Sequence, residues 1–330
     1  MKAIVYQTAH NIADFNLLVF DLPEPEISPN DVLISVKAIS INPVDAKIRQ
    51  SRNAKNDHPV ILGWDAAGVI EKMGNNVSGF AVGDTVYYAG DLLRDGCYAA
   101  QQAVDYRIIA KKPHNLSFAD AAALPLTAIT AWEALLERGF TYTDQTKVLI
   151  IGGAGGVGSI ATQLLKAKTP ADVITTASRP ETIAWSKQMG ADFVINHHND
   201  LSQELKKIDI ETVDIIFGTT QSEKYWAKIP TLLRPFGHYC LIDDPKTLDI
   251  VAFKTKALSV HWEFMFAKTM HQYNIETQGA ILREIAQLVE AGKIKSTVNT
   301  VLNGLTVEHI KASHASIESG QSIGKVVIDF

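Results

Sequence analysis

Cysteine is scarce in this chain, because Cys97 and Cys240 are the only thiols among its 330 residues. Two thiols cannot build a disulfide framework or a four-cysteine metal site, so we expect a reducing, cytoplasmic environment. A surplus of positive charge is also absent, since the formal net charge is −5. This balance offers no electrostatic footprint for a nucleic acid partner.

Long apolar runs are missing too. The longest nearly apolar stretch spans 121–136 and is interrupted by Pro125 and Glu133. It is shorter than the ~20 residues that cross a bilayer, and the opening MKAIVYQTAH lacks the apolar core of a signal peptide. We therefore predict no membrane segment. The stretch is instead predicted to be a buried helix that begins after Ser117 and is kinked or interrupted at Pro125.

The first part of the chain, to roughly residue 115, is predicted to be mostly β. Short runs of strand-forming residues are broken by Gly, Asn and Asp every eight to twelve residues or so, which is typical of a barrel or sandwich. The candidate strands are 32–41, 68–74, 84–90, 97–104 and 106–110.

From about residue 117 onward, helical stretches alternate with strand candidates. The strand candidates are 148–151, 173–177, 193–196, 213–217, 239–243 and 258–264. This alternation indicates an α/β unit with a doubly wound parallel sheet and right-handed crossovers. A chain of this length suggests about two domains.

The last part of the chain contains an amphipathic helix over 279–294, with Ile281, Ile285, Leu288 and Val289 on its apolar face. The final run KVVIDF, 325–330, is a strand candidate. A strand must pair, and we expect the N-terminal β unit to be its host.

Residues 148–166, VLIIGGAGGVGSIATQLLK, are predicted to form a strand, a glycine-rich turn and a helix. Gly153, Gly155 and Gly158 fit the pattern G-x-G-x-x-G, in which the first glycine allows a tight turn, the second lets the backbone approach a pyrophosphate, and the third lets the helix pack close to the strand. The free N–H groups and the dipole of the helix favour an anion there. A dinucleotide site is therefore predicted, with a merely structural turn as the alternative.

The end of the next strand decides between NADH and NADPH. An acid there would bond both ribose hydroxyls of NAD and repel a 2′-phosphate. The sequence has Ser178 and Arg179 at this corner and no acid before Glu181. A hydroxyl and a guanidinium suit a phosphate dianion, so we predict NADPH. The alternative is that Arg179 is a solvated turn residue.

Taken together, these features resemble the medium-chain dehydrogenase/reductase superfamily. The resemblance is closest to its quinone oxidoreductase branch and to bacterial proteins called zinc-type alcohol dehydrogenase-like. The segments that carry it are 40–49, 61–70, 82–90, 124–135, 150–163, 175–185, 189–197, 261–267 and 322–328.

The resemblance implies a GroES-like β-barrel domain over 1–120 and 270–330 and a Rossmann domain over 121–269, with the active site between them. It also implies a homodimer that extends the Rossmann sheet across two subunits. The run LSVHWEF, 258–264, is a plausible edge strand for that pairing.

The zinc implied by part of the family fails a residue-by-residue comparison. The family's histidine ligand is replaced by Trp64, and its two cysteine ligands map to about Asn42 and Leu126. Asp45 and Asp65 remain nearby, but two carboxylates without His or Cys make a poor zinc site. We therefore expect no metal.

Without a metal, alcohol oxidation loses its main source of alkoxide stabilisation, whereas reduction of a conjugated double bond is less demanding. We therefore predict an NADPH-dependent reductase of quinones or α,β-unsaturated carbonyls. The alternatives are a zinc-type alcohol dehydrogenase and a non-catalytic NADPH-binding sensor protein. The small-molecule substrate itself is not specified by the sequence.

The pocket candidates come from the family elements. Asn42 is predicted to donate an amide N–H near the substrate, and Asp45 either joins it or orders the loop through backbone bonds. Lys47 is either a cationic donor or simply exposed. Trp64 and Tyr88 either wall the pocket or pack in the core.

The cofactor candidates include the glycine loop, the phosphate corner, and positions from the resemblance. In the resemblance, 264–266 is the strand that meets the nicotinamide through backbone groups, and Lys325 is a phosphate contact. The full set is Thr127, Gly153, Gly155, Gly156, Val157, Gly158, Ser178, Arg179, His197, Gly218, Thr219, Phe264, Met265, Phe266 and Lys325.

Overall fold

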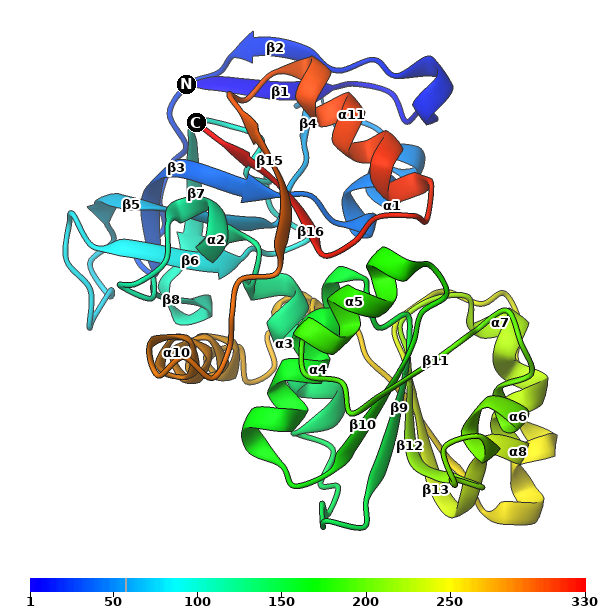
Figure 1. Ribbon diagram of the computed structural model, residues 1–330. Coiled ribbons are helices and arrows are strands. Elements are labelled where there is room, and N and C mark those ends of the chain that lie inside the picture. The colour runs from blue at the N-terminus through cyan, green and yellow to red at the C-terminus, as the bar shows by residue number, and fades with distance from the viewer. Residues whose placement is uncertain (57) are drawn as a thin grey trace. The chain divides into compact units, whose positions relative to one another are not determined.

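The computed structural model describes residues 1–56 and 58–330 (Figure 1). The chain forms two compact units. The first unit comprises 1–129, 266–292 and 296–330, and the second comprises 130–265 and 293–295. The domain boundaries expected from the sequence stay predictions.

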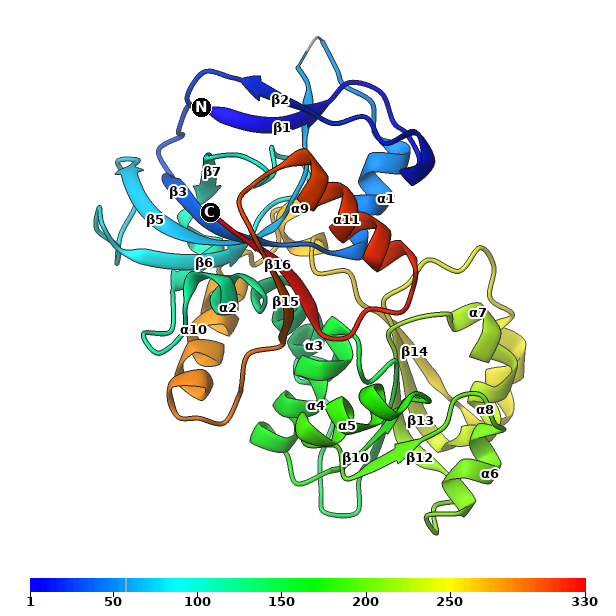
Figure 2. The same cartoon turned by 45° about the horizontal axis from the view of Figure 1, so that its top comes forward.

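The first unit is built on two sheets (Figure 2). The larger sheet has the order β15-β16-β3-β5-β6-β8, with β7 also paired to β3, and the smaller sheet has the order β2-β1-β4. The larger sheet contains β3 (Asp31–Ser40), β5 (Asp65–Met73), β6 (Thr85–Ala89), β7 (Gln101–Asp105), β8 (Ile109–Lys111), β15 (Val298–Asn303) and β16 (Lys325–Asp329). The smaller contains β1 (Lys2–Tyr6), β2 (Leu18–Asp21) and β4 (Val60–Ile61).

The predicted strand over 106–110 is wrong in its first half. Residues Tyr106–Ile108 form a 3-10 helix, η2, and the strand begins at Ile109. The reason is local, because the Asp105 carboxylate accepts a hydrogen bond from the Arg107 amide at 2.9 Å and caps that turn.

The predicted C-terminal strand is confirmed. β16 pairs antiparallel with β3 and parallel with β15, so the chain returns to the first unit. In this register Val327 lies opposite Ser40. The return therefore brings Lys325 beside the loop that follows β3.

Helix boundaries follow the signals in the sequence. α2 (Phe118–Ala122) begins after Ser117, whose hydroxyl accepts from the Asp120 amide at 3.0 Å, and α3 (Pro125–Leu135) begins at Pro125, so the predicted interruption is confirmed. The amphipathic stretch forms α10 (Glu276–Glu290), with Ile281, Ile285 and Val289 buried. The first unit also contains α1 (Pro43–Ser51), α9 (Ala267–Met270) and α11 (Val307–Glu318), whereas α3 runs from the first unit into the second.

The second unit has one parallel sheet of order β11-β10-β9-β12-β13-β14, with helices on both faces (Figure 1). Its strands are β9 (Lys147–Ile151), β10 (Asp172–Thr176), β11 (Phe193–Ile195), β12 (Val213–Gly218), β13 (Leu233–Leu241) and β14 (Ser259–Trp262). Its helices include α4 (Gly156–Lys168), α5 (Pro180–Gln188), α6 (Leu201–Lys206), α7 (Ser222–Tyr225) and α8 (Ile229–Leu232). The predicted doubly wound sheet is confirmed.

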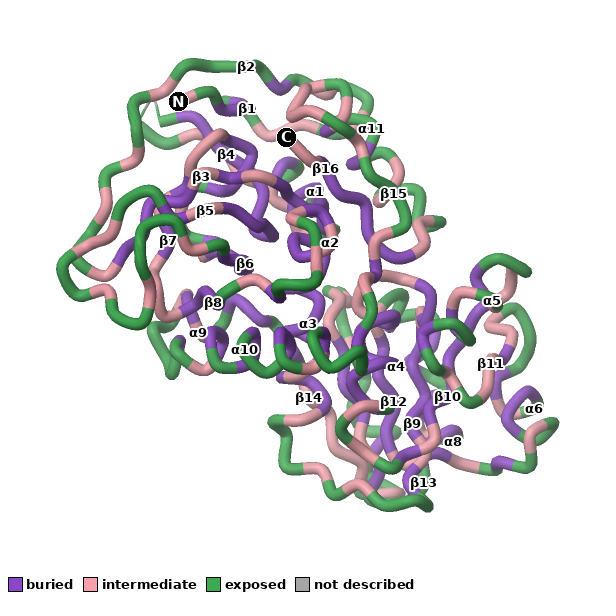
Figure 3. The backbone as a smooth tube through the Cα atoms, turned by 60° about the vertical axis from the view of Figure 1, so that its left-hand side comes forward, coloured by how far each residue is buried: buried purple, intermediate pink, exposed green. Residues whose placement is uncertain are grey.

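The central strands β9 and β12 are almost wholly buried on both faces (Figure 3). Burial on both faces explains the unbroken apolar run of Val148–Ile151, because neither face of the strand meets water. Within 1–56 and 58–330, no helix is long and apolar enough to cross a membrane.

Candidate active site

The glycine-rich loop joins β9 to the first turn of α4. Gly152 has a φ of +88°, and a Cβ there would lie 2.4 Å from the Thr219 Oγ1. A Cβ at Gly158 would lie 2.3 Å from the Gly152 carbonyl oxygen, so the helix packs close to the loop as predicted. The tight turn was assigned to Gly153, but the left-handed residue is Gly152, which the sequence pattern did not single out. Gly153 instead faces the Thr175 side chain, 2.4 Å from where its Cβ would be.

Gly155 differs from its neighbours. A Cβ at this position would meet only the Gly152 oxygen at 3.5 Å, an ordinary contact. Gly155 is also the N-cap of α4 and supplies no side-chain cap to the first N–H groups of that helix, those of Gly156 and Val157 among them. The fold of the chain therefore does not require glycine at 155, whereas a ligand lying across the helix N-terminus would require it.

The corner at the end of β10 collects positive charge. The Ser178 hydroxyl lies 3.2 Å from the His197 Nε2, and the Arg179 Nε lies 3.2 Å from a Glu181 carboxylate oxygen. The pKa of His197 is lowered by partial burial and by the positive charges of His198, Lys224 and Arg179. Lys224 was missed by the sequence analysis because it comes from α7, far along the chain, and only the fold brings it near His197.

Gly218 and Thr219 follow β12 at the carboxyl edge of the sheet, where Gly218 lies opposite Ile151. The Thr219 hydroxyl donates to the Ile151 carbonyl at 2.8 Å, and a Cβ on Gly218 would collide with the Tyr239 hydroxyl at 2.4 Å. Both residues thus lie at the predicted edge. The missing side chain of Gly218 leaves room for Tyr239, and the Thr219 hydroxyl bonds to the end of β9.

The three residues expected to form a nicotinamide-binding strand lie outside any strand. β14 ends at Trp262, and Met265 and Phe266 form the turn into α9. Met265 and Phe266 are buried, whereas Phe264 is 46% exposed. The strand is shorter than predicted because the chain turns to begin a helix at Ala267.

Thr127 is buried in α3, and its hydroxyl donates to the Leu124 carbonyl oxygen at 3.1 Å. In this arrangement the hydroxyl hydrogen is used within the helix. The structure therefore gives no support to a cofactor contact from Thr127.

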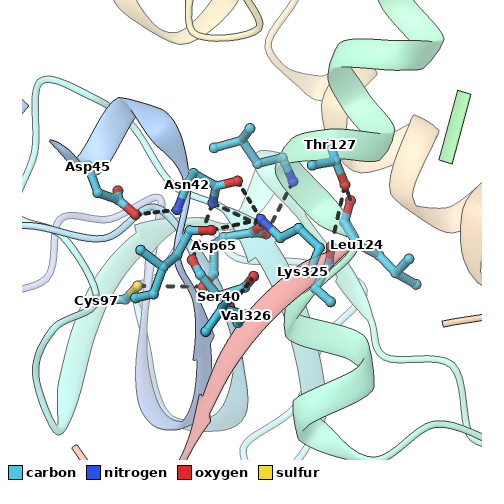
Figure 4. Close-up of polar contacts among 12 residues, drawn as sticks. Ser40, Asn42, Asp45, Asp65, Cys97, Leu124, Thr127, Lys325 and Val326 are labelled. Atoms are coloured by element: carbon cyan, nitrogen blue, oxygen red, sulfur yellow. Dashed lines mark hydrogen bonds and ion pairs between the residues drawn. The ribbon is translucent and has the colours of Figure 1, made fainter. Parts of the chain in front are cut away.

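A buried polar cluster in the first unit gathers three of the predicted site residues (Figure 4). The Lys325 Nζ donates to the Asn42 Oδ1 at 2.5 Å, to the Ile41 carbonyl oxygen at 3.2 Å, and to the Asp65 Oδ2 at 3.3 Å. Lys325 is only 3% exposed. Its ammonium is thus held inside the first unit, and its predicted role as a cofactor phosphate contact is not supported.

Asn42 follows β3 and caps α1. Its Nδ2 donates to the Ser40 carbonyl oxygen at 3.2 Å and to the Asp65 Oδ2 at 3.1 Å, which uses both amide hydrogens. The side chain is also buried. Neither amide hydrogen of Asn42 is therefore free for the predicted donation to a substrate. Burial raises the pKa of Asp65 to about 6, opposed chiefly by the charge of Lys325.

Asp45 orders the loop, which is the second of the two roles considered for it. Its Oδ2 accepts from the Asn42 amide at 2.7 Å, completing a capping box, and also from the Tyr98 hydroxyl at 3.2 Å. The Oδ1 is buried without a hydrogen-bond partner, and burial raises the pKa of Asp45 to about 7.

Tyr98 connects this cluster to a series of hydrogen-bonded side chains that the sequence did not reveal. The His314 Nε2 lies 3.0 Å from the Tyr98 hydroxyl, and the Arg49 Nη1 lies 3.2 Å from the His314 Nδ1. A guanidinium only donates, so Nδ1 must accept and the His314 proton lies on Nε2. The series ends at an ion pair, in which the Arg49 Nη2 lies 2.6 Å from the Glu318 Oε1.

The remaining catalytic candidates are dispersed in the first unit. Trp64 and Tyr88 are fully buried, with the Trp64 Nε1 donating to the Asp91 carbonyl oxygen at 3.0 Å and the Tyr88 hydroxyl to the Gln102 Oε1 at 2.8 Å. Both therefore pack in the core. Lys47 is exposed on α1.

The residues at the family's zinc positions do not fit that metal. By the resemblance, Asn42 and Leu126 stand at about the positions of the sulfur ligands, and Trp64 stands at that of the imidazole. The nearest thiol, on Cys97, is buried and donates to the Asp65 carbonyl oxygen at 3.7 Å. Among the described residues, no three His, Cys, Asp or Glu side chains group in a way that could hold a metal ion.

Comparison with known proteins gives two domain matches and full-length relatives. An alcohol dehydrogenase GroES-like domain model matches residues 28–114, and a zinc-binding dehydrogenase model matches 189–328. The zinc-type alcohol dehydrogenase-like protein of Staphylococcus epidermidis is 39% identical over 339 residues, covering 100% of this chain and 99% of the relative.

Two further proteins extend the comparison. A chloroplastic NADPH-dependent alkenal/one oxidoreductase of Arabidopsis thaliana is 28% identical over 336 residues, covering 99% of this chain and 79% of the relative. The crystal structure of a candidate zinc-dependent alcohol dehydrogenase from Rhizobium etli has a TM-score of 0.96 at 42% identity, covering 100% of this chain and 98% of that one.

A GroES-like β unit combined with a Rossmann unit that carries a glycine-rich β–α loop defines a two-domain oxidoreductase fold. The chain belongs to the medium-chain dehydrogenase/reductase superfamily.

Proposed function

We propose that this protein is an NADPH-dependent oxidoreductase that reduces quinones or α,β-unsaturated carbonyls by hydride transfer without zinc. The observation that carries the proposal is the glycine loop with a corner beside it in which the charged side chains of Arg179 and Lys224 act on His197, and His197 is bonded to Ser178. The plant relative, an NADPH-dependent alkenal/one oxidoreductase, supports the same cofactor and substrate class.

The corner at the end of β10 favours a phosphate over a bare ribose. Ser178 stands where an acid would bond the ribose hydroxyls of NADH, and a hydroxyl can donate to a phosphate oxygen. Arg179 is paired with Glu181 at an exposed position, where an ion pair contributes little to stability. A 2′-phosphate dianion would therefore displace this pairing at small cost and gain a charge-assisted bond.

The proposed reaction needs no Lewis acid. When bound, NADPH would supply a hydride to the β-carbon of the conjugated system, whose C=C electron pair would then move to form an enolate. A proton then adds to the α-carbon of an enone, or to the oxygen of a quinone, to give the reduced product and NADP⁺. The negative charge is delocalised throughout, so a metal is less needed than for a simple alkoxide.

The amide hydrogens of Asn42 and the ammonium hydrogens of Lys325 are already bonded to oxygens of the first unit. Neither group is therefore assigned as the proton donor. Solvent is the proposed source of the proton, since proton transfer from water needs no dedicated side chain.

The test is a spectrophotometric assay at 340 nm with NADPH and, in turn, a small quinone, an enone and an aldehyde. We expect oxidation of NADPH with the quinone or the enone, unchanged by a chelator. Turnover of the aldehyde alone, lost on chelation, would establish the alternative of a zinc-type alcohol dehydrogenase. Binding of NADPH without any turnover would establish the sensor alternative.

A homodimer is part of the proposal. β14 is the last strand of the parallel sheet, and Trp262 at its end is 51% exposed. An exposed edge strand with a large apolar side chain is a ready pairing surface for a second copy. A cytoplasmic location also remains proposed, in keeping with the unpaired thiols of Cys97 and Cys240.

A further inference from the structure

The Lys325 ammonium lies where oxygens from separate parts of the first unit converge. Its three acceptors are the Ile41 carbonyl oxygen, the Asn42 Oδ1 and the Asp65 Oδ2, at 3.2, 2.5 and 3.3 Å. An ammonium has three N–H donors, so each acceptor takes one. All the hydrogens of this buried cation are therefore used inside the protein.

The same place is where the resemblance puts a metal. Asn42 stands at the position of one family cysteine ligand, and its side-chain oxygen is the nearest of the three acceptors of the ammonium. Leu126 stands at the position of the other, and its backbone N–H donates to the Asp65 Oδ1 at 3.2 Å. Both positions that the resemblance assigns to cysteine ligands thus contact the Asp65–Lys325 ion pair.

We propose that Lys325 is the resident cation of this cluster and takes the structural place of a metal ion. It acts as a positioning residue, because its ammonium fixes the loop before α1 and neutralises Asp65 without touching a substrate. The proposal goes beyond the proposed function and depends on neither the cofactor nor the substrate.

Electrostatic repulsion explains why the Lys325 ammonium excludes a metal ion from this cluster. Asp65 is fully buried and needs a positive partner, which the ion pair with Lys325 supplies. A divalent ion bound to the same oxygens would stand within a few ångströms of the ammonium, where like charges repel strongly in a dry interior. While lysine is present, metal binding is unfavourable. Once lysine is removed, three oxygens remain, and oxygen ligands suit Mn²⁺.

The test compares thermal unfolding of the full chain, without and with MnCl₂, in wild type and in Lys325→Met. We expect the variant to unfold at least about 5 °C lower, because it leaves a buried carboxylate unpaired, and to regain part of this loss with Mn²⁺. Wild type should not respond to Mn²⁺. The matched control is Lys72→Met, which removes the exposed ion pair with Glu24 and should change the midpoint by about 1 °C or less.

Two further variants keep the outcome decisive. Lys325→Arg retains the charge and should unfold near wild type without a response to Mn²⁺. Lys325→Met combined with Asp65→Asn removes both charges, so it should be more stable than Lys325→Met alone and lose the response to the metal.

Three results would overturn the proposal. The first is wild-type protein that retains one zinc per chain after desalting. The second is a Lys325→Met midpoint that is lowered but indifferent to Mn²⁺, which would show an ordinary ion pair. The third is failure of both Lys325→Met and its Asp65→Asn combination to fold. If only the single variant fails to fold, the rescue by Asp65→Asn supports the proposal. None of these measurements uses turnover, so they are independent of the enzymatic assay.

Discussion

At the scale of single residues, the glycine loop separates positions that the fold needs from a position that a ligand needs. Gly158 cannot carry a Cβ without meeting the Gly152 carbonyl oxygen at 2.3 Å, whereas Gly155 can. A methyl group at the two positions therefore has different consequences.

We expect Gly155→Ala to fold with a thermal midpoint near that of wild type and to bind NADPH at least about 10-fold more weakly, because the added methyl group occupies the path of the pyrophosphate. Gly158→Ala, as the contrasting variant, should lower the midpoint. Fluorescence titration with NADPH and thermal unfolding measure the two effects. Undiminished affinity in Gly155→Ala would remove the loop from the cofactor site.

Arg179 is expected to determine the preference for NADPH over NADH. Arg179→Glu should weaken NADPH binding by about 10- to 100-fold and leave NADH binding nearly unchanged, because only the 2′-phosphate meets the reversed charge. The control is Lys187→Glu, an equal charge change on the exposed face of α5. Equal losses for NADPH and NADH would contradict the assignment of the corner.

Asp45 makes stability depend on pH. Its pKa is raised from 3.8 to about 7, so the native state keeps a proton that the unfolded state has already lost between those values. The contribution is therefore full below pH 4 or so and is lost as the pH rises toward 7, with a total of roughly 2–4 kcal/mol.

Asp45→Asn should flatten this dependence. The amide oxygen still accepts from the Asn42 amide and the Tyr98 hydroxyl, while the group no longer loses a proton. Urea unfolding between pH 5 and 8 measures it, with the exposed Asp14→Asn as the control. A slope unchanged in Asp45→Asn would show that Asp45 does not carry the titration.

At the scale of elements, the edge strand β14 determines the expected assembly. Trp262→Lys places a charge on the edge and should convert a dimer into a monomer of 36.1 kDa, as measured by light scattering after gel filtration. Tyr273→Lys, an exposed aromatic position of the first unit, should leave the mass unchanged. A monomeric wild type would refute the dimer.

The elements also show what the sequence can predict. The strand over 148–151, the helix after it and the interruption at Pro125 depend on nearby residues, and they were predicted correctly. The end of β14 was misplaced because apolar and aromatic residues recur at alternate positions in 258–264, the last of them Phe264, beyond the point where the strand ends. Local pattern alone does not mark such an end.

At the scale of the whole molecule, the polar cluster depends on residues that are remote in sequence. Asp65 and Lys325 are 260 positions apart, and Tyr98 and His314 are 216 apart. The family resemblance suggested a phosphate contact for Lys325, and only the pairing of β16 with β3 reveals its partners inside the first unit. Lys224 near His197 was missed for the same reason.

The late place of β16 in the chain has a consequence for biosynthesis. A ribosome releases β3 and β5 long before it makes Lys325, and the second unit emerges in between. Asp65 therefore has no Lys325 to pair with while the nascent polypeptide grows. The first unit can complete its fold only after β16 has been translated. Domains that emerge whole can fold as they appear. We expect the second unit to be the earlier of the two to resist protease during synthesis.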